Sequence, residues 1–104
     1  MELATWRSWW RGPGERELRE VLLDVWDPIG ISDFPEAADE YDAYLGQIAR
    51  RLRDGDSTEE LARFLGGLTA RMGLEPRPDA DLMAAREIEA WYRLSTTSFD
   101  RPRT

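Results

Sequence analysis

The chain has 104 residues, enough to enclose one hydrophobic core and too few for two, so we expect a single domain over residues 1–104. It contains no cysteine and no histidine, which excludes disulfides, thiolate and imidazole metal sites, and catalytic triads that need an imidazole base. All fourteen basic residues are arginine, a bias typical of GC-rich bacterial genomes, and the net charge at pH 7 is −7.

The negative charge is concentrated in one segment. Between Arg19 and Arg50 the chain has eight acidic residues and no basic one, whereas the rest of the chain has thirteen acidic residues and fourteen arginines. Nucleic acids and anionic membranes would be repelled by such a segment, because affinity for polyphosphate comes mainly from lysine and arginine. We therefore expect no direct binding to nucleic acid and none to membranes.

An apolar stripe with helical spacing begins the chain. Leu3, Trp6 and Trp10 recur at i, i+3 and i+7 with Trp9 alongside, which predicts a short helix that ends at the hinge Gly12-Pro13-Gly14. The helix and hinge together occupy about residues 1–13. We favour packing of the three indoles in the core, with docking of a partner on them as the alternative.

Two helices are predicted on either side of a loop. The first extends from about Glu15 to Trp26, where Asp27-Pro28 should end it, because a residue before proline is disfavoured in the α region. The second begins near Tyr41, with acidic residues at its start and arginines at its end, and Gly55 is a natural residue to follow it.

Two more helices are predicted in the C-terminal half. Ser57-Thr58-Glu59-Glu60 has the pattern of a capping box, and Gly66-Gly67 inside the helix that it begins indicates a close helix crossing. Asp79 is expected to cap the last helix, whose apolar stripe extends to Leu94. Residues 95–104 are polar and are expected to form a flexible tail.

No segment alternates with the period of a strand, so the expected fold class is all-α, a compact bundle of four main helices plus a short N-terminal helix. Ile29, Ile31 and Phe34 should hold the loop against the core. Whether the bundle forms a homo-oligomer stays open, because an apolar stripe looks the same within a monomer and across a dimer. The predicted core consists of Val21, Leu22, Val25, Tyr44, Ile48, Leu61, Leu65, Leu68 and Ile88.

Two uncommon strings flank the loop: Trp26-Asp27-Pro28-Ile29-Gly30 and Asp39-Glu40-Tyr41-Asp42-Ala43-Tyr44. Together they resemble the signature of an uncharacterised family of small bacterial helical proteins, which share W-D-P-I-G before a loop and D-E-Y-D-x-Y at the start of the next helix. The resemblance covers roughly residues 18–74. It implies a helical fold, with no activity attached.

The acidic residues of these strings have a structural interpretation. Asp27 can accept hydrogen bonds from backbone N–H groups of its own turn, and Asp39 can cap the helix that follows. Clustered carboxylates also suit Mg²⁺ or Ca²⁺, but the spacing of an EF-hand is absent and acids at a helix start suit its dipole. We therefore predict no metal and no cofactor. The residues expected to structure the loop are Trp26, Asp27, Pro28, Gly30 and Asp39.

We expect a non-enzymatic protein-interaction module, such as an immunity protein or an antitoxin, that binds another protein with a basic surface. No catalytic residue is expected. The candidate partner-binding residues are Asp24, Asp33, Glu36, Glu40 and Asp42, with Trp6, Trp9 and Trp10 as the alternative face.

The sequence leaves two other functions open. They are a carboxylate-metal hydrolase, which would need three or more converging carboxylates, and a structural accessory domain. No apolar run is long enough to cross a bilayer, and the N-terminus lacks the layout of a signal peptide, so we expect a cytoplasmic location.

Overall fold

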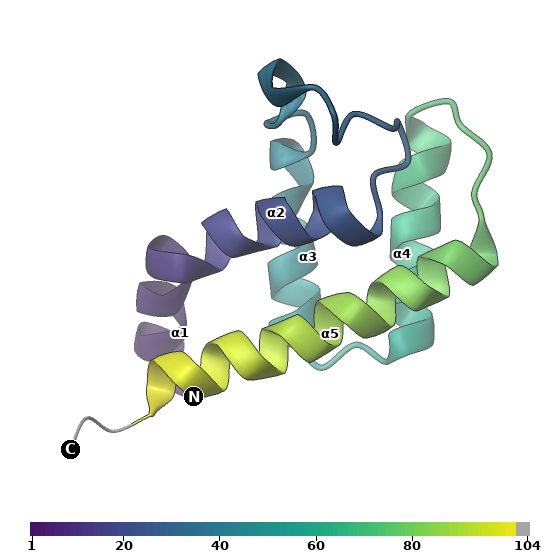
Figure 1. Ribbon diagram of the computed structural model, residues 1–104. Coiled ribbons are helices and arrows are strands. Elements are labelled where there is room, and N and C mark those ends of the chain that lie inside the picture. The colour runs from purple at the N-terminus through teal and green to yellow at the C-terminus, as the bar shows by residue number, and fades with distance from the viewer. Residues whose placement is uncertain (102–104) are drawn as a thin grey trace.

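The structure is a computed structural model that describes residues 1–101, and within them it has helices and no strand (Figure 1). The expected all-α class is confirmed. The helices are α1 (Leu3–Trp9), α2 (Glu15–Val25), α3 (Asp42–Arg53), α4 (Thr58–Arg71) and α5 (Pro78–Asp100), with a π-helical segment η1 (Trp10–Gly14) and a 3-10 turn η2 (Pro35–Ala37).

The N-terminal helices are joined by a kink rather than by a loop. Helical turns continue from Leu3 to Val25, and Gly12, with φ −84° and ψ −108°, is the residue that leaves the helical conformation. As a result α1 lies at a steep angle to α2 (Figure 1). A Cβ at Gly14 would lie 3.1 Å from atoms of the Trp9 and Trp10 rings, so glycine permits this tight bend.

The ends of the central helices follow local rules that the sequence predicts. Gly55 and Gly73 both have positive φ, of 83° and 79°, and each directly follows the C-cap residue of its helix, α3 or α4. At the start of α4, Ser57 and Glu60 form the predicted capping box, with reciprocal hydrogen bonds of 3.1 and 2.9 Å.

The long helix α5 differs from the prediction at both ends. It begins at Pro78, whose ring favours the first helical position, so Arg77 occupies the cap position and Asp79 lies inside the first turn instead of capping it. It ends at Asp100, so residues 95–100 are helical rather than a tail. The rest of the predicted tail lies almost wholly outside the described residues.

Tertiary hydrogen bonds explain why the helix continues. The Ser95 hydroxyl accepts a hydrogen bond from Trp9 Nε1 at 2.9 Å and donates one to Glu17 Oε1 at 2.8 Å. These bonds fix the last turns of α5 against α1 and α2, which contact α5 (Figure 1). Leu94, in contrast, points away from the core and is 71 % exposed.

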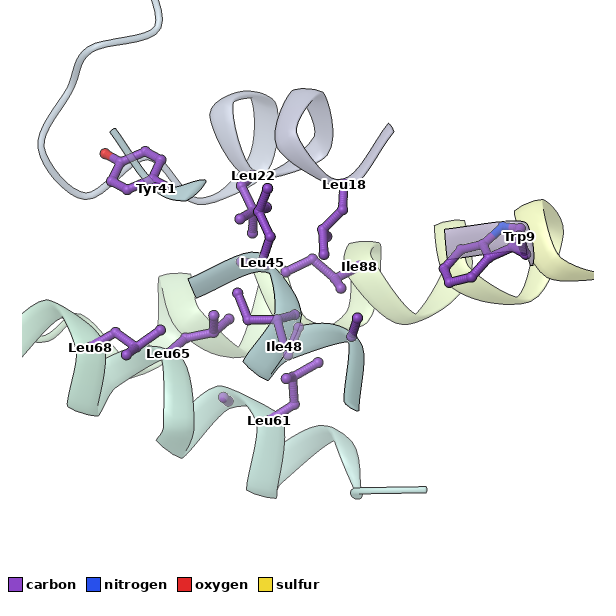
Figure 2. Close-up of a cluster of buried hydrophobic side chains, with 14 of the residues drawn as sticks. Trp9, Leu18, Leu22, Tyr41, Leu45, Ile48, Leu61, Leu65, Leu68 and Ile88 are labelled. Carbon is purple, nitrogen blue, oxygen red and sulfur yellow. The ribbon is translucent and has the colours of Figure 1, made fainter. Parts of the chain in front are cut away.

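The core contains side chains from all five helices, and Figure 2 shows Leu18, Leu22, Leu45, Ile48 and Ile88 facing one another between α2, α3 and α5. Six of the predicted core residues are buried. The other three, on α2 and α3, are only partly buried and pack against the buried core. The buried six are Leu22, Ile48, Leu61, Leu65, Leu68 and Ile88; the partly buried three are Val21, Val25 and Tyr44.

Trp6 and Trp9 are buried, and Trp10 is half-buried with its ring stacked on Trp6 at 6.1 Å. Trp6 and Trp9 therefore pack in the core as expected and Trp10 packs against it, whereas Leu3 at the start of the stripe is 46 % exposed. Burial leaves little of Trp6 and Trp9 for a partner to contact. Within residues 1–101 no helix is long and apolar enough to cross a membrane.

Candidate functional site

Asp27 holds the loop between α2 and α3 together. Its φ of +35° is unusual for a residue with a side chain, and its carboxylate compensates by accepting four hydrogen bonds. Three come from the backbone N–H groups of Gly30, Ile31 and Ser32 at 2.9 to 3.1 Å, and the fourth from the Tyr41 hydroxyl at 2.7 Å. The predicted role of Asp27 in its own turn is confirmed.

Tyr41 connects the two strings that flank the loop. Its buried hydroxyl donates to Asp27 and accepts from the Ile29 N–H at 3.0 Å, while its ring lies 5.3 Å from the ring of Trp26. Burial is the main cause that raises the pKa of Tyr41 well above its ordinary value, and the hydrogen bond to Asp27 is the second. The hydroxyl therefore stays a donor at neutral pH. The pair of strings is therefore a structural unit that braces the loop.

The charge of Asp27 should contribute to stability. Burial alone would raise the pKa of the Asp27 carboxyl, but the hydrogen bonds from Ile31, Tyr41 and Ser32 outweigh it and place the pKa below 3.8. A carboxyl whose pKa is lower in the folded protein than in the unfolded chain stabilises the fold fully at pH values above its unfolded-state pKa. This contribution is lost as the pH falls through its folded-state pKa.

Replacing Asp27 by asparagine should therefore lower the free energy of unfolding by about 1–2 kcal/mol at pH 7, because an amide cannot accept all four bonds in a half-exposed loop. Urea unfolding from pH 8 to pH 3 measures this, and the difference from wild type should shrink below about pH 4. Asp33→Asn, at an exposed carboxylate in the same loop, is the control and should change stability by less than about 0.5 kcal/mol. Equal stability of the Asp27 variant at every pH would show that other contacts hold the loop.

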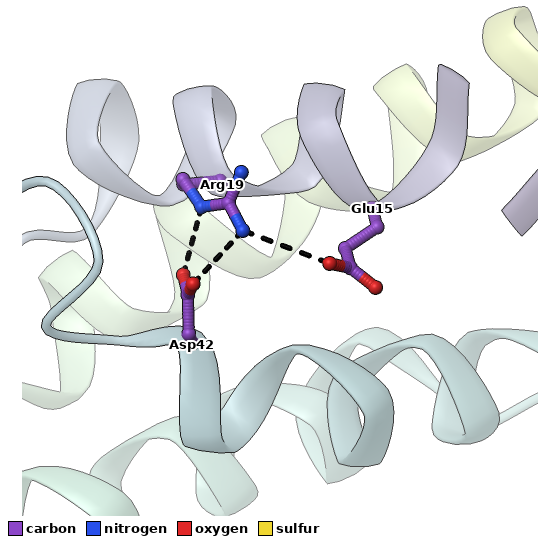
Figure 3. Close-up of polar contacts among 3 residues, drawn as sticks. All are labelled: Glu15, Arg19 and Asp42. Carbon is purple, nitrogen blue, oxygen red and sulfur yellow. Dashed lines mark hydrogen bonds and ion pairs between the residues drawn. The ribbon is translucent and has the colours of Figure 1, made fainter. Parts of the chain in front are cut away.

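Asp39 does not cap α3, contrary to the prediction. It is exposed, and Tyr41 occupies the cap position without a side-chain capping bond. The next acid, Asp42, lies in the first turn of α3 and pairs with Arg19 of α2, as Figure 3 shows. Both contacts of this bidentate pair are 2.8 Å long, and Glu15 approaches the same guanidinium at 3.6 Å.

The ion pair removes Asp42 from the set of freely available acids. Its hydrogen bonds raise the pKa of Arg19, and they tie the start of α3 to the middle of α2. The other candidate partner-binding acids, Asp24, Asp33, Glu36 and Glu40, are exposed.

Two large apolar side chains lie among these acids. Ile29 is 43 % exposed and Phe34 is 54 % exposed, so the expectation that they pack onto the core is wrong, although Ile31 is partly buried there. The loop that carries both residues projects from one edge of the bundle (Figure 1). We call Ile29, Asp33, Phe34, Glu36, Asp39 and Glu40 the acidic loop face.

Comparison of the chain with models of known protein families, with curated proteins and with solved structures finds no match. The resemblance to a family of uncharacterised bacterial proteins stays a prediction.

Asp81 was not among the candidate residues expected from the sequence, but it lies in a pocket that Trp26 and Thr69 also line. Asp81 lies in the first turn of α5 and is only 4 % exposed. Burial raises the pKa of the Asp81 carboxyl, although the indole N–H of Trp26 and the backbone of Arg77 lie close enough to oppose the shift. From the sequence alone, an aspartate near a helix start is explained by the helix dipole.

Among the residues that the structure describes, the carboxylates do not gather into a metal site. Within residues 1–101 no group of three or more aspartates and glutamates lies close enough to share a metal ion. The exposed acids belong to a surface, and Asp81 lies in a separate pocket with Trp26. Exposed carboxylates can attract positive charge, whereas acid and base chemistry needs two carboxyl groups converging on one substrate.

Proposed function

We propose that the protein is a non-enzymatic interaction module whose acidic loop face binds a partner protein with a basic surface. The observation that carries this proposal is the exposure of Phe34, which lies in the chain between the exposed acids Asp33 and Glu36. An apolar anchor within a charged rim has the composition of a protein-protein interface.

The braced conformation of the loop supports the same function. The hydrogen bonds of Asp27 and Tyr41 hold the backbone from Ile29 to Ser32, and the Phe34 N–H donates to the Ile31 carbonyl, so little conformational entropy is lost when a partner binds. The rim acids would speed the encounter with a basic surface and disfavour acidic competitors. Small acidic helical proteins that neutralise basic toxins, such as immunity proteins and antitoxins, work by this complementarity, and by analogy we place the protein in that class.

The test compares two triple variants with the same change in charge. One carries Asp33→Asn, Glu36→Gln and Glu40→Gln in the acidic loop face; the control carries Glu2→Gln, Glu59→Gln and Glu87→Gln at exposed acids elsewhere. Both should melt near the wild-type temperature, since each surface change costs less than about 0.5 kcal/mol. Partners captured by the wild type from a bacterial lysate are purified, and their association rates with all three proteins are measured by surface plasmon resonance.

The loop variant should associate about threefold to tenfold more slowly at low ionic strength, with a flatter dependence on salt, while the control variant keeps most of the wild-type rate. Phe34→Ala should act mainly on dissociation, as expected for an interface anchor. Equal rates for the two triple variants would contradict the proposal and favour a structural accessory domain or another interface.

A further inference from the structure

A pocket of about 190 Å³ lies where the end of α2, the connection between α4 and α5, and the start of α5 meet. Trp26, Thr69, Glu75 and Asp81 are among the side chains that line it. The pocket is distinct from the acidic loop face, and its residues are not part of that face.

Two polar groups meet in this pocket, and neither has a charged partner. Asp81 as a residue is only 4 % exposed, and its carboxylate forms no ion pair within the described part of the chain. The Trp26 Nε1 is also buried and, among residues 1–101, has no hydrogen-bond partner of ordinary geometry although it faces Asp81. Arg77 lines the same pocket, but its side chain is exposed to solvent and leaves Asp81 uncompensated. A buried carboxylate without a counter-ion is costly to keep in a fold.

Asp81 also lines a second, more open hollow of about 380 Å³ above Gly66 and Gly67 of α4, flanked by Pro76 and Pro78. A Cβ at Gly66 would lie 3.2 Å from Asp81 Oδ2, so this glycine permits the close approach of α5. The predicted close crossing is therefore confirmed at Gly66.

Gly67 has no such reason to be glycine. A Cβ there would meet no atom within 4 Å, and glycine inside a helix is less stable than alanine. Gly67 lines the hollow beside Asp81, together with mostly apolar residues and Arg63, and a Cβ at Gly67 would take up part of that space. A site that maintains an unfilled apolar groove next to an uncompensated buried carboxylate is matched to a ligand with a positive head and an apolar stem.

We propose that this site binds an organic cation that consists of one ammonium or guanidinium group on a short aliphatic stem. The charged group pairs with the Asp81 carboxylate, which has lone pairs enough to accept from both the ligand and the Trp26 indole. The stem lies over Gly66 and Gly67. The cation is either a free alkylamine or the side chain of a lysine or arginine in another protein.

The experiment titrates the ¹⁵N-labelled full chain with n-pentylammonium chloride and follows the indole and amide signals by NMR. The Trp26 indole and the Gly67 amide should shift and saturate, whereas the Trp6 and Trp9 indoles, which already donate to Tyr92 and Ser95, should not move. Pentanol, which has the stem without the charge, should produce no saturable shift.

Two pairs of variants then test each half of the site. Asp81→Asn keeps the shape and should weaken pentylammonium binding at least about tenfold, while Asp33→Asn on the acidic loop face leaves it unchanged. Gly67→Ala should melt at a higher temperature yet bind pentylammonium several-fold more weakly, with little effect on methylammonium, which has no stem. Gly46→Ala in α3, where a Cβ would also meet no atom within 4 Å, should stabilise the helix without changing binding.

The result identifies the source of the cation as well. Tighter binding of a capped Gly-Lys-Gly peptide than of pentylammonium assigns the site to a side chain of another protein, and the opposite order assigns it to a free amine. Unchanged binding to Asp81→Asn, or shifts confined to residues 33–40, would overturn the proposal. The second of these results would place the cation on the acidic loop face instead and would leave the proposed function standing.

Discussion

Replacing Trp9 by alanine should lower the free energy of unfolding by about 3–5 kcal/mol, toward the upper end of what a single core substitution costs. The Trp9 side chain is fully buried, and its removal leaves a cavity that the rigid neighbouring rings cannot fill. Its ring centroid lies 5.4 to 6.0 Å from four other aromatic rings, those of Trp6, Trp10, Trp91 and Tyr92.

The same change breaks a chain of hydrogen bonds. Trp9 Nε1 donates to Ser95, and both Ser95 and Trp91 donate to the Glu17 carboxylate, so three helices are linked through these side chains. Without Trp9 the last turns of α5 should fray, which amide hydrogen exchange of residues 95–100 would detect.

Urea unfolding followed by circular dichroism measures the loss, and Trp10→Ala is the matched control. Trp10 is on the adjacent position and is half-buried, so its replacement should cost clearly less. Equal losses for the two variants would mean that the burial of Trp9 does not control the stability of this end of the bundle.

Ile48→Ala is expected to have the next largest effect, a loss of about 2–5 kcal/mol. Ile48 is fully buried on α3 and faces Leu18, Leu22 and Ile88 across the centre of the bundle (Figure 2). Since a domain of this size has a total stability of about 5–15 kcal/mol, such a loss is a large part of it.

Two further variants make the measurement specific. Ile48→Val removes one methylene and should cost only about 0.5–1.5 kcal/mol, because the remaining cavity is small. Leu52→Ala, one turn further along α3 and only partly buried, should cost less than Ile48→Ala. The midpoints of urea unfolding should follow this order with an unchanged slope; a melting temperature of Ile48→Ala within a degree or two of wild type would contradict the core assignment.

Much of the local structure could be predicted from the sequence, because it depends on residues a few positions apart. The capping box of Ser57 and Glu60, and the positive φ of Gly55 and Gly73, each involve contacts within one helical turn. The same applies to the apolar stripes of α2, α3 and α4, whose spacing identified most of the buried leucines and isoleucines. The turn of Asp27 belongs here too, because its backbone donors are three to five residues away.

The candidate site was predicted only in part, because exposure is decided by what packs on a side chain. Phe34 and Ile29 have the hydrophobicity of core residues, yet the path of the loop leaves them in solvent. Asp39 and Asp42 both looked suited to a helix start, and only the position of Arg19 on α2 selects Asp42 for an ion pair. Spacing along the chain contains no information on which of two neighbouring acids will meet that arginine.

By itself the sequence determined the helical class, the positions of most helices and the acidic character of the loop, since these follow from periodicity, local capping and composition. The tertiary structure alone decided that α5 continues to Asp100 and that Asp81 is buried beside Trp26. The hydrogen-bond partners of Ser95 lie on α1 and α2, 86 and 78 residues away in the sequence. Asp81 lies beside the indole of Trp26, which follows the end of α2. Contacts between residues so far apart in the sequence depend on how the helices cross. The residues of the neighbouring helix therefore supply the energy that keeps a carboxylate buried or a last helical turn folded.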